Sequence, residues 1–233
     1  IHKVVDGGFE LGIGLDGDAD RIGVVDEKGN MLFGDEIMNI FARDFLKSNP
    51  GEKVVADVKT SKVFYDDVKA KGGVPIMYKT GHSMIKEKMT KENVLLGGEM
   101  SGHIFFKDRY FGFDDAIYAS CRFMEILSKT DKKTSELLAD LPKPFNTPEI
   151  RVDCPDNIKF KLVEDVKQSF IAEGCEVITV DGMRINFPDG WGLLRPSNTQ
   201  PVLVLRFEAD TEKRCLEIKD LVEGRIEEFK RGL

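Results

Sequence analysis

The sequence has little of what marks membrane, disulfide-rich or nucleic-acid-binding proteins. Its four cysteines are scattered along 233 residues and show neither C-x-x-C nor zinc-ligand spacing. That pattern favours a reduced, cytoplasmic setting. No apolar run approaches the length of a membrane span, and no signal peptide opens the chain. A net charge of −7 argues against the broad basic face of a general nucleic-acid binder. We therefore expect a cytoplasmic protein that binds neither membrane nor nucleic acid.

An initiator methionine is also missing, because the chain opens Ile1-His2-Lys3. A strand pattern follows within a dozen residues and leads into an acidic loop. We expect a chain that starts partway through a domain.

The acidic loop, G-L-D-G-D-A-D-R-I-G over residues 14–23, organises the first part of the chain. Asp16, Asp18 and Asp20 occupy alternate positions and can turn toward one point, as a hard cation such as Mg²⁺ requires. Arg21 adds a planar donor fork that suits phosphate oxygens. A plain solvated turn has the same composition. A calcium loop ending at Glu27 is disfavoured, because Arg21 stands where that template needs glycine.

The pattern of apolar residues predicts an α/β fold. Strands alternate with helices capped at Asp35 and Ser61, which favours a mixed, largely parallel sheet with helices. Three prolines in the segment 142–148 predict a domain boundary, and the pattern beyond it is α+β. The expected strands are 11–26 (interrupted by the acidic loop), 31–33, 53–57, 74–78, 94–96, 149–153, 177–180, 184–187 and 202–208. Further helices are expected over 82–91, 114–128, 157–172 and 211–230.

Three more polar loops follow predicted strands of the first part, where ligands of parallel sheets bind. One contains Lys59 and another contains His82, and each leads into a helix start that can bind an anion or can simply be a capping loop. The third places Glu99, Ser101 and His103 between glycines, a set that can accept and donate hydrogen bonds to sugar hydroxyls. A turn with incidental polar residues is the alternative. A Ser–His nucleophile is disfavoured, because no G-x-S-x-G elbow is present.

A last polar loop lies in the second part and spans 195–201. Arg195 offers a bidentate fork, and Ser197, Asn198 and Thr199 offer short donors that could form an anion nest. This inventory fits a phosphate monoester, although a plain turn would have the same residues.

Six segments together resemble the α-D-phosphohexomutase family, in the family's order and over nearly the whole chain. They are G-L-D-G-D-A-D-R, D-V-K-T-S, K-T-G-H-S-M-I-K, G-E-M-S-G-H-I-F-F, F-G-F-D-D and R-P-S-N-T-Q-P-V-L-V-L-R-F-E-A-D. Met100 and Asn198 stand where the phosphoglucosamine branch usually carries Gln and Gly, which favours the bacterial phosphomannomutase/phosphoglucomutase branch.

The resemblance implies an isomerase that moves phosphate between C1 and C6 of glucose or mannose phosphates. It implies a phosphoserine enzyme, Mg²⁺, and glucose or mannose 1,6-bisphosphate as intermediate, with hexose 1-phosphate and 6-phosphate as substrates. Of the four family domains, residues 1–33 would end the second, 34–144 would form the third, and 145–233 the fourth, a TATA-binding-protein-like α+β domain.

The resemblance also implies roles for the residues singled out above. It places Asp16, Asp18 and Asp20 on the metal and Arg21 beside the transferring phosphoryl group. Lys59 and His82 match catalytic positions that line the active site. It assigns substrate binding to Glu99, Ser101, His103, Arg195, Ser197, Asn198 and Thr199.

One departure from the family pattern is the nucleophile. No serine here has the family's Thr-x-Ser-His-Asn context. The resemblance therefore implies that the serine lies in missing N-terminal domains of the same enzyme, and that the chain alone is inactive. The alternative is a module that binds sugar phosphates without turnover.

Overall fold

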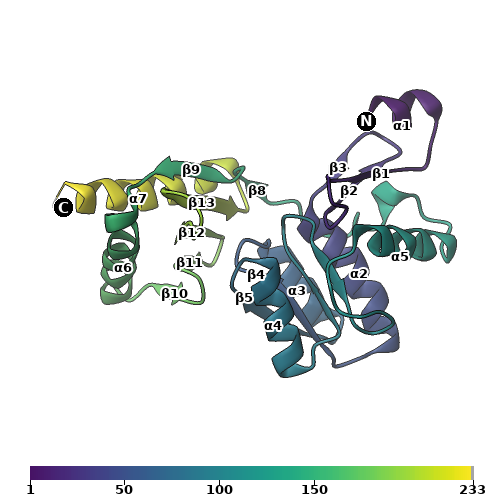
Figure 1. Cartoon of the computed structure of the whole chain (residues 1–233). Coiled ribbons are helices and arrows are strands. Elements are labelled where there is room, and N and C mark those ends of the chain that lie inside the picture. Colours follow the sequence, from purple (N-terminus) through teal and green to yellow (C-terminus); the bar gives the residue numbers. More distant parts are fainter. Residues whose placement is uncertain (232–233) are drawn as a thin grey trace. The chain divides into compact units, whose positions relative to one another are not determined.

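The computed structural model describes residues 1–231, which form two compact units (Figure 1). The first unit spans Ile1–Pro142 and the second begins at Lys143, inside the proline-rich segment. Among the described residues, no helix has both the length and the apolar character that crossing a membrane requires.

The first unit combines two sheets with helices. Its elements are α1 (His2–Gly7), β1 (Leu11–Leu15), β2 (Ile22–Asp26), β3 (Met31–Leu32), α2 (Gly34–Ser48), β4 (Lys53–Asp57), α3 (Lys62–Ala70), β5 (Val74–Tyr78), α4 (His82–Glu92), β6 (Leu96–Gly98), β7 (Ile104–Phe106), α5 (Ala116–Ser128) and the 3₁₀ turn η1 (Thr134–Glu136). The strands β1, β2 and β3 form a small antiparallel sheet and lie where strands were expected around the acidic loop.

The larger sheet of this unit has the order β5-β4-β6-β7. β4 pairs in parallel with β5 and β6, whereas β7 is antiparallel, so the predicted mixed, largely parallel sheet is confirmed. Alternate residues of β4 face opposite sides. Val54 and Ala56 join the core built with α2, α3 and α5, and Val55 joins a smaller core with Ile85 and Met89 of α4.

The strand predicted over 94–96 was placed too early in the chain. β6 instead contains Gly97 and Gly98, which were expected to begin the polar loop that carries Glu99. A Cβ atom on Gly98 would lie 2.3 Å from Met38 Sδ, and one on Gly97 would lie 2.7 Å from Met89 Sδ. Glycine is therefore needed because helices approach this strand closely on both faces, a cause that local sequence patterns do not reveal.

The two predicted helix caps have different outcomes. Ser61 caps α3, since its Oγ accepts a hydrogen bond from the Val63 N–H at 3.2 Å. The prediction for Asp35 is wrong, because α2 already begins at Gly34. The Glu36 side chain accepts from the Phe33 N–H at 2.9 Å, and Asp35 accepts from the Ser61 N–H at 3.1 Å. Asp35 thus joins the starts of two helices.

The second unit is one antiparallel sheet with two helices. Its elements are β8 (Phe145–Asn146), β9 (Ile150–Asp153), α6 (Asp156–Ala172), β10 (Glu176–Ile178), β11 (Met183–Phe187), β12 (Gly190–Pro196), β13 (Val202–Ala209) and α7 (Glu212–Lys230). The sheet order is β10-β11-β12-β13-β8, with β9 also paired to β13. Apolar residues of one sheet face form a core with both helices, which agrees with the predicted α+β class.

β12, which pairs with β11 and β13, was not expected from the sequence. Its sequence G-W-G-L-L-R-P lacks alternation, because residues on both sheet faces are buried. Arg195 consequently lies on a strand and not in a loop, which is a correction to the expectation above.

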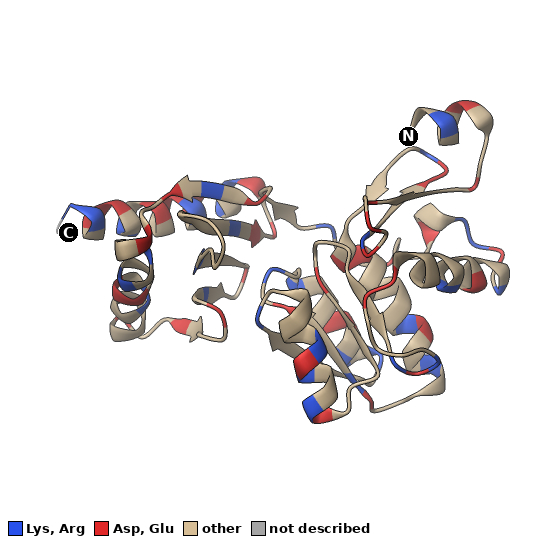
Figure 2. Cartoon of the chain, viewed as in Figure 1, with Lys and Arg blue, Asp and Glu red and all other residues tan. Residues whose placement is uncertain are grey.

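The helices carry charges of both signs on their exposed faces, as Figure 2 shows along α4 and α7. Several of these charges pair one turn apart, as in the contact of Lys219 Nζ with Glu223 at 2.7 Å. Exposed pairs of this kind add only about 0.3–0.5 kcal/mol each to helix stability. The cores described above therefore hold the units together.

Candidate functional site

The acidic loop closes the β1–β2 hairpin of the first unit. Leu15 pairs with Ile22, so residues 16–21 turn within one tight connection, and Ala19 adopts a positive φ of 59°. The Ala19 carbonyl is tied to the start of α5 by the Ala116 N–H at 3.0 Å.

This turn brings together the carboxylates of Asp16, Asp18 and Asp20, called here the aspartate triad. One oxygen from each lies within 4.8 Å of the others. Three carboxylates at this spacing suit an oxygen-preferring cation such as Mg²⁺, with room for water or phosphate ligands.

Arg21 lies against the same carboxylates. Its Nε donates to Asp16 Oδ2 at 2.5 Å, and Asp16 Oδ1 accepts from the backbone N–H groups of Asp20 and Arg21 at 3.2 Å. Desolvation by itself would raise the pKa of Asp16, but the hydrogen bonds from Arg21 outweigh it and lower the pKa to about 2. Asp16 is therefore ionised at neutral pH, and a metal ion would share it with a guanidinium.

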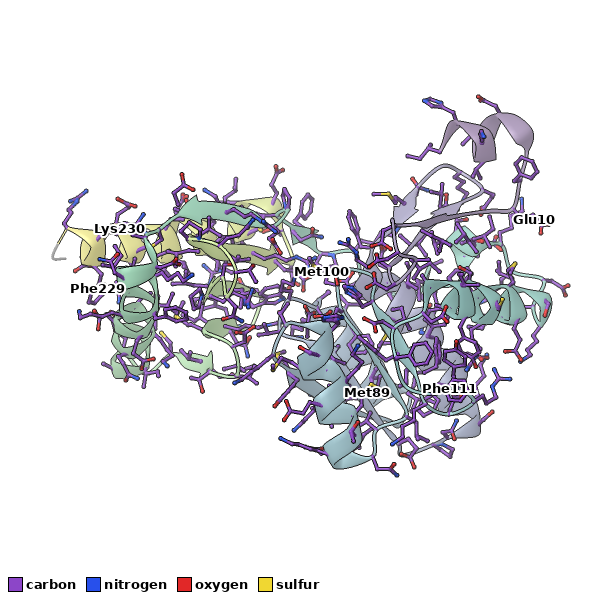
Figure 3. The ribbon with its side chains drawn as sticks, in the orientation of Figure 1. Glu10, Met89, Met100, Phe111, Phe229 and Lys230 are labelled. Carbon is purple, nitrogen blue, oxygen red and sulfur yellow. The ribbon has the colours of Figure 1, made fainter. Side chains whose placement is uncertain are left out.

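The loop between β6 and β7 is attached directly to the acidic loop. Arg21 and His103 form an antiparallel bridge, and the Ile22 N–H donates to the Gly102 carbonyl at 3.1 Å. A Cβ on Gly102 would lie 2.6 Å from the Ile22 carbonyl oxygen, and the residue has a φ of +97°. Glycine permits this close approach. The loop also contains Met100, which Figure 3 labels.

The side chains of this second loop contact each other. Glu99 is 2% exposed, and it accepts from the Gly81 N–H at 2.6 Å and lies 3.1 Å from His103 Nδ1. Ser101 Oγ is 2.8 Å from the same nitrogen. Burial lowers the pKa of His103, but its contacts with the Glu99 carboxylate dominate and raise that pKa overall. Glu99 thus helps to hold the loop in addition to being a candidate ligand for sugar.

His82 is the first residue of α4, and its ring lies near that of His103. Its Nδ1 lies 3.0 Å from Asp114 Oδ2, whose other oxygen accepts from Lys86 Nζ at 3.0 Å. The rings of His82 and His103 are 5.6 Å apart between centroids. The structure therefore brings His82, His103 and the aspartate triad together. No role was expected for Asp114 or Lys86, although both belong to segments that resemble the family.

Lys59 follows β4, and its Nζ lies 4.0 Å from Asp57 Oδ2. Asp57 is fully buried, and burial raises its pKa. It accepts hydrogen bonds from Thr60 Oγ1 at 2.8 Å and from the Met100 N–H at 3.3 Å. Asp57 links the Lys59 loop to the Glu99 loop. This role of Asp57 was not expected, although an aspartate at the end of a buried strand was the available signal.

The predicted phosphate-binding residues lie in the second unit. Arg195 donates from Nε to Asp181 Oδ2 at 2.8 Å. Ser197 Oγ accepts from the backbone N–H groups of Thr199 at 3.4 Å and Gln200 at 3.2 Å. These bonds form a compact turn, which also contains Asn198.

Comparison with known proteins identifies both units. Residues 33–145 match the model described as phosphoglucomutase/phosphomannomutase, alpha/beta/alpha domain III, and residues 149–224 match the C-terminal domain of the same family. The chain belongs to the phosphoglucomutase/phosphomannomutase family. Its α/β architecture and the resemblance drawn from the six segments are thereby confirmed.

Individual family members agree with this assignment. The chain is 47% identical over 229 residues to a phosphoglucomutase of Neisseria gonorrhoeae, covering 97% of this chain and 50% of that protein. It is 44% identical over 226 residues to a phosphomannomutase/phosphoglucomutase of Pseudomonas syringae, covering 97% and 49%. The chain thus spans about half the length of the curated relatives it matches.

Solved structures of the family give the same picture. A Burkholderia thailandensis phosphoglucomutase/phosphomannomutase family protein superposes with a TM-score of 0.92 at 40% identity, over 100% of this chain and 49% of that one. An N-acetylphosphoglucosamine mutase of Aspergillus fumigatus, solved in complex with GlcNAc-6P and magnesium, shares the fold alone, with a TM-score of 0.64 and 17% identity over 92% and 48% of the two chains.

Proposed function

We propose that this chain is the C-terminal portion of a phosphomannomutase/phosphoglucomutase, which transfers phosphate reversibly between C1 and C6 of glucose and mannose phosphates. The observation that carries the proposal is the direct attachment of the Glu99 loop to the aspartate triad, through the Arg21–His103 bridge. That attachment places groups suited to sugar hydroxyls beside groups suited to a cation and a phosphoryl group.

Each residue has a role in this proposal. The aspartate triad would hold Mg²⁺, which would supply charge neutralisation for phosphoryl transfer. Arg21 and Lys59 offer positive charge to phosphoryl oxygens, and His82 lies at the N-terminus of α4, where anions bind favourably. Glu99, Ser101 and His103 orient sugar hydroxyls. The magnesium of the Aspergillus fumigatus complex supports the choice of cation.

In this proposal the second unit binds the phosphate group of the sugar that is not being transferred. Arg195, Ser197, Asn198 and Thr199 are the residues we assign to it. The donors of this set are neutral or positive, as a phosphate monoester requires. Glucose or mannose 1,6-bisphosphate is the intermediate that turns between the two phosphate positions.

The nucleophilic serine belongs, in this proposal, to residues outside the 233 described by the sequence. The proposed location is cytoplasmic, and the domain division at residues 33/34 and 144/145 remains part of the proposal.

Conversion of glucose 1-phosphate and mannose 1-phosphate, followed by ³¹P NMR with Mg²⁺ present, tests the function. We expect turnover of both sugars by a polypeptide in which a segment with the family's Thr-x-Ser-His-Asn motif, called here the serine segment, precedes this chain. We expect no turnover by the 233-residue chain. Turnover by the pure chain would overturn the assignment of the serine. Absence of turnover by the longer polypeptide would overturn the mutase itself and leave a sugar-phosphate-binding module.

A further inference from the structure

Four side chains from four separate segments converge beside the aspartate triad. They are Asp20 of the acidic loop, His82 at the start of α4, His103 before β7 and Asp114 before α5. One ligand atom from each lies within 4.8 Å of the other three. We call this group the His–Asp tetrad, and only Asp20 belongs to both it and the triad.

The contacts within the tetrad pair each imidazole with one carboxylate. His82 Nδ1 lies 3.0 Å from Asp114 Oδ2, and His103 Nε2 lies 3.5 Å from Asp20 Oδ2. Ligand atoms of a tetrahedral ion bound at about 2.0–2.2 Å are separated by only slightly more than 3 Å. The four groups therefore need only small side-chain movements to surround one ion.

The outer contacts of the tetrad hold its ligands in orientation. His103 Nδ1 faces Glu99 Oε2 at 3.1 Å, so a proton on Nδ1 leaves the Nε2 lone pair directed toward the tetrad. Asp114 Oδ1 is held by Lys86 Nζ, which leaves Oδ2 on the side of His82. A carboxylate that orients a histidine through its second nitrogen is a recurrent feature of protein zinc sites.

The donor set separates this cluster chemically from the triad. Two imidazole nitrogens and two carboxylate oxygens suit a borderline ion such as Zn²⁺, whereas Mg²⁺ prefers oxygen ligands throughout. We propose that the His–Asp tetrad is a second metal site, which binds one transition-metal ion of the zinc class. Because Asp20 is shared, an ion in the tetrad withdraws one ligand from the Mg²⁺ site, and the two ions compete.

Titration of the 233-residue chain with Zn²⁺ by calorimetry, and with Co²⁺ by visible absorption, tests the proposal. Wild type should bind one Zn²⁺, and its Co²⁺ form should show the intense absorption of a tetrahedral site with nitrogen and oxygen ligands. His82→Ala and Asp114→Asn should each weaken Zn²⁺ binding by at least about tenfold. Half of the His82 side chain is exposed, at 52%, so its replacement should not unfold the unit.

Two matched controls distinguish this site from others. His2→Ala removes the third histidine of the chain, which is exposed in α1, and should leave Zn²⁺ binding unchanged. Asp18→Asn removes a triad ligand that the tetrad does not use, and should also leave Zn²⁺ binding in place.

Three results would overturn the proposal. One is the absence of Zn²⁺ binding by wild type. Another is equal binding by wild type and by folded His82→Ala and Asp114→Asn, with folding checked by circular dichroism. The third is loss of Zn²⁺ in Asp18→Asn alone, which would place the ion in the aspartate triad.

Discussion

The guanidinium of Arg195 is braced by Asp181, with Nε of the arginine 2.8 Å from Oδ2 of the aspartate. The brace uses the Nε edge of the guanidinium, and within residues 1–231 the terminal Nη atoms of Arg195 make no hydrogen bond that the structure records. Pairing with an acid and anchoring a phosphate are therefore compatible roles, because they use different edges of one planar group.

Arg195→Lys, made in the polypeptide that carries the serine segment, should lower turnover as well as substrate affinity. Lysine supplies only a point charge, whereas the planar guanidinium of Arg195 can pair with Asp181 on one edge and offer the proposed phosphate its other edge. In the proposed mechanism the phosphate bound at Arg195 positions the reacting end of the sugar, so a weaker phosphate contact should reduce kcat as well. We expect similar losses in kinetics with glucose 1-phosphate and mannose 1-phosphate, whose phosphates are identical. A lowered Tm with kinetics unchanged at a permissive temperature would leave Arg195 only a structural role.

Arg21→Gln should tighten Mg²⁺ binding by the chain, since Arg21 competes for the Asp16 oxygens. The arginine side chain is 52% exposed, so the ion pair is weak, and the Mg²⁺ affinity should rise only about two- to fivefold. Calorimetry with Mg²⁺ measures this change. Arg109→Gln removes an arginine of similar exposure that pairs with Glu125, and should have no effect. Weaker Mg²⁺ binding by Arg21→Gln would mean that this arginine shapes the loop.

Much of this architecture could be predicted because its signals are local. Alternating aspartates in a glycine-containing turn, and helices and strands of ordinary periodicity, are visible in the sequence alone. The features that were missed depend on contacts distant in sequence. Gly98 lies in a strand on which Met38 packs closely, and Asp57 accepts a hydrogen bond from the Met100 N–H of another loop.

In the candidate site, too, features with a local sequence signal were predicted, and features that depend on contacts distant in sequence were not. Sequence patterns identified His82 and His103, but only the fold brings their rings to 5.6 Å and adds Asp114 to them. The residues around Arg195 led to the prediction that it binds phosphate, whereas its place on β12 and its partner Asp181 depend on strand pairing.

Gly34→Ala should destabilise the first unit, although alanine is the better helix former. A Cβ at Gly34 would lie 2.4 Å from the Met100 carbonyl oxygen and 2.6 Å from that of Glu99, and backbone cannot move as a flexible side chain can. We expect a loss of about 1–3 kcal/mol in the free energy of unfolding, measured by urea denaturation. Gly224→Ala in α7 meets no atom within 4 Å and should instead add about 0.5–1 kcal/mol. Equal gains in both variants would contradict the close approach of α2 to the Glu99 loop.

Acid should weaken the contact between Arg43 and Asp140 at a defined pH. Arg43 donates to both Asp67 and Asp140, and its hydrogen bond lowers the pKa of Asp140 from 3.8 to about 2. A depressed pKa stabilises the fold above pH 3.8, and that stabilisation is lost as the pH falls toward 2. Since the Asp140 side chain is 59% exposed, we expect no more than about 1 kcal/mol.

The measurement for this pair is urea unfolding of wild type and Asp140→Asn at pH 6 and pH 2.5. The difference between the two proteins should shrink at the lower pH. Asp131→Asn, at an exposed position, is the control and should match wild type at both. A difference that does not change with pH would show that Asp140 acts through packing and not through its charge.

Glu99→Gln should impair sugar recognition in the polypeptide that carries the serine segment, while the fold survives. The glutamine carbonyl can still accept from the Gly81 N–H, but its amide replaces a charged acceptor on the side of His103. A carboxylate accepts hydrogen bonds at both oxygens, so one acceptor offered to a hydroxyl becomes a donor. Such a mismatch costs on the order of 1–3 kcal/mol, and kcat/KM should fall by about ten- to a hundredfold for both sugars.

Glu125→Gln, which changes an acid on α5 that pairs with Arg109 and Lys129, is the matched control and should retain wild-type kinetics. Steady-state assays with glucose 1-phosphate and mannose 1-phosphate measure the loss of kcat/KM, and thermal melts check that the fold of Glu99→Gln survives. Unchanged kinetics in Glu99→Gln would reduce this loop to a structural turn, because the change would then remove no contact that the substrate uses.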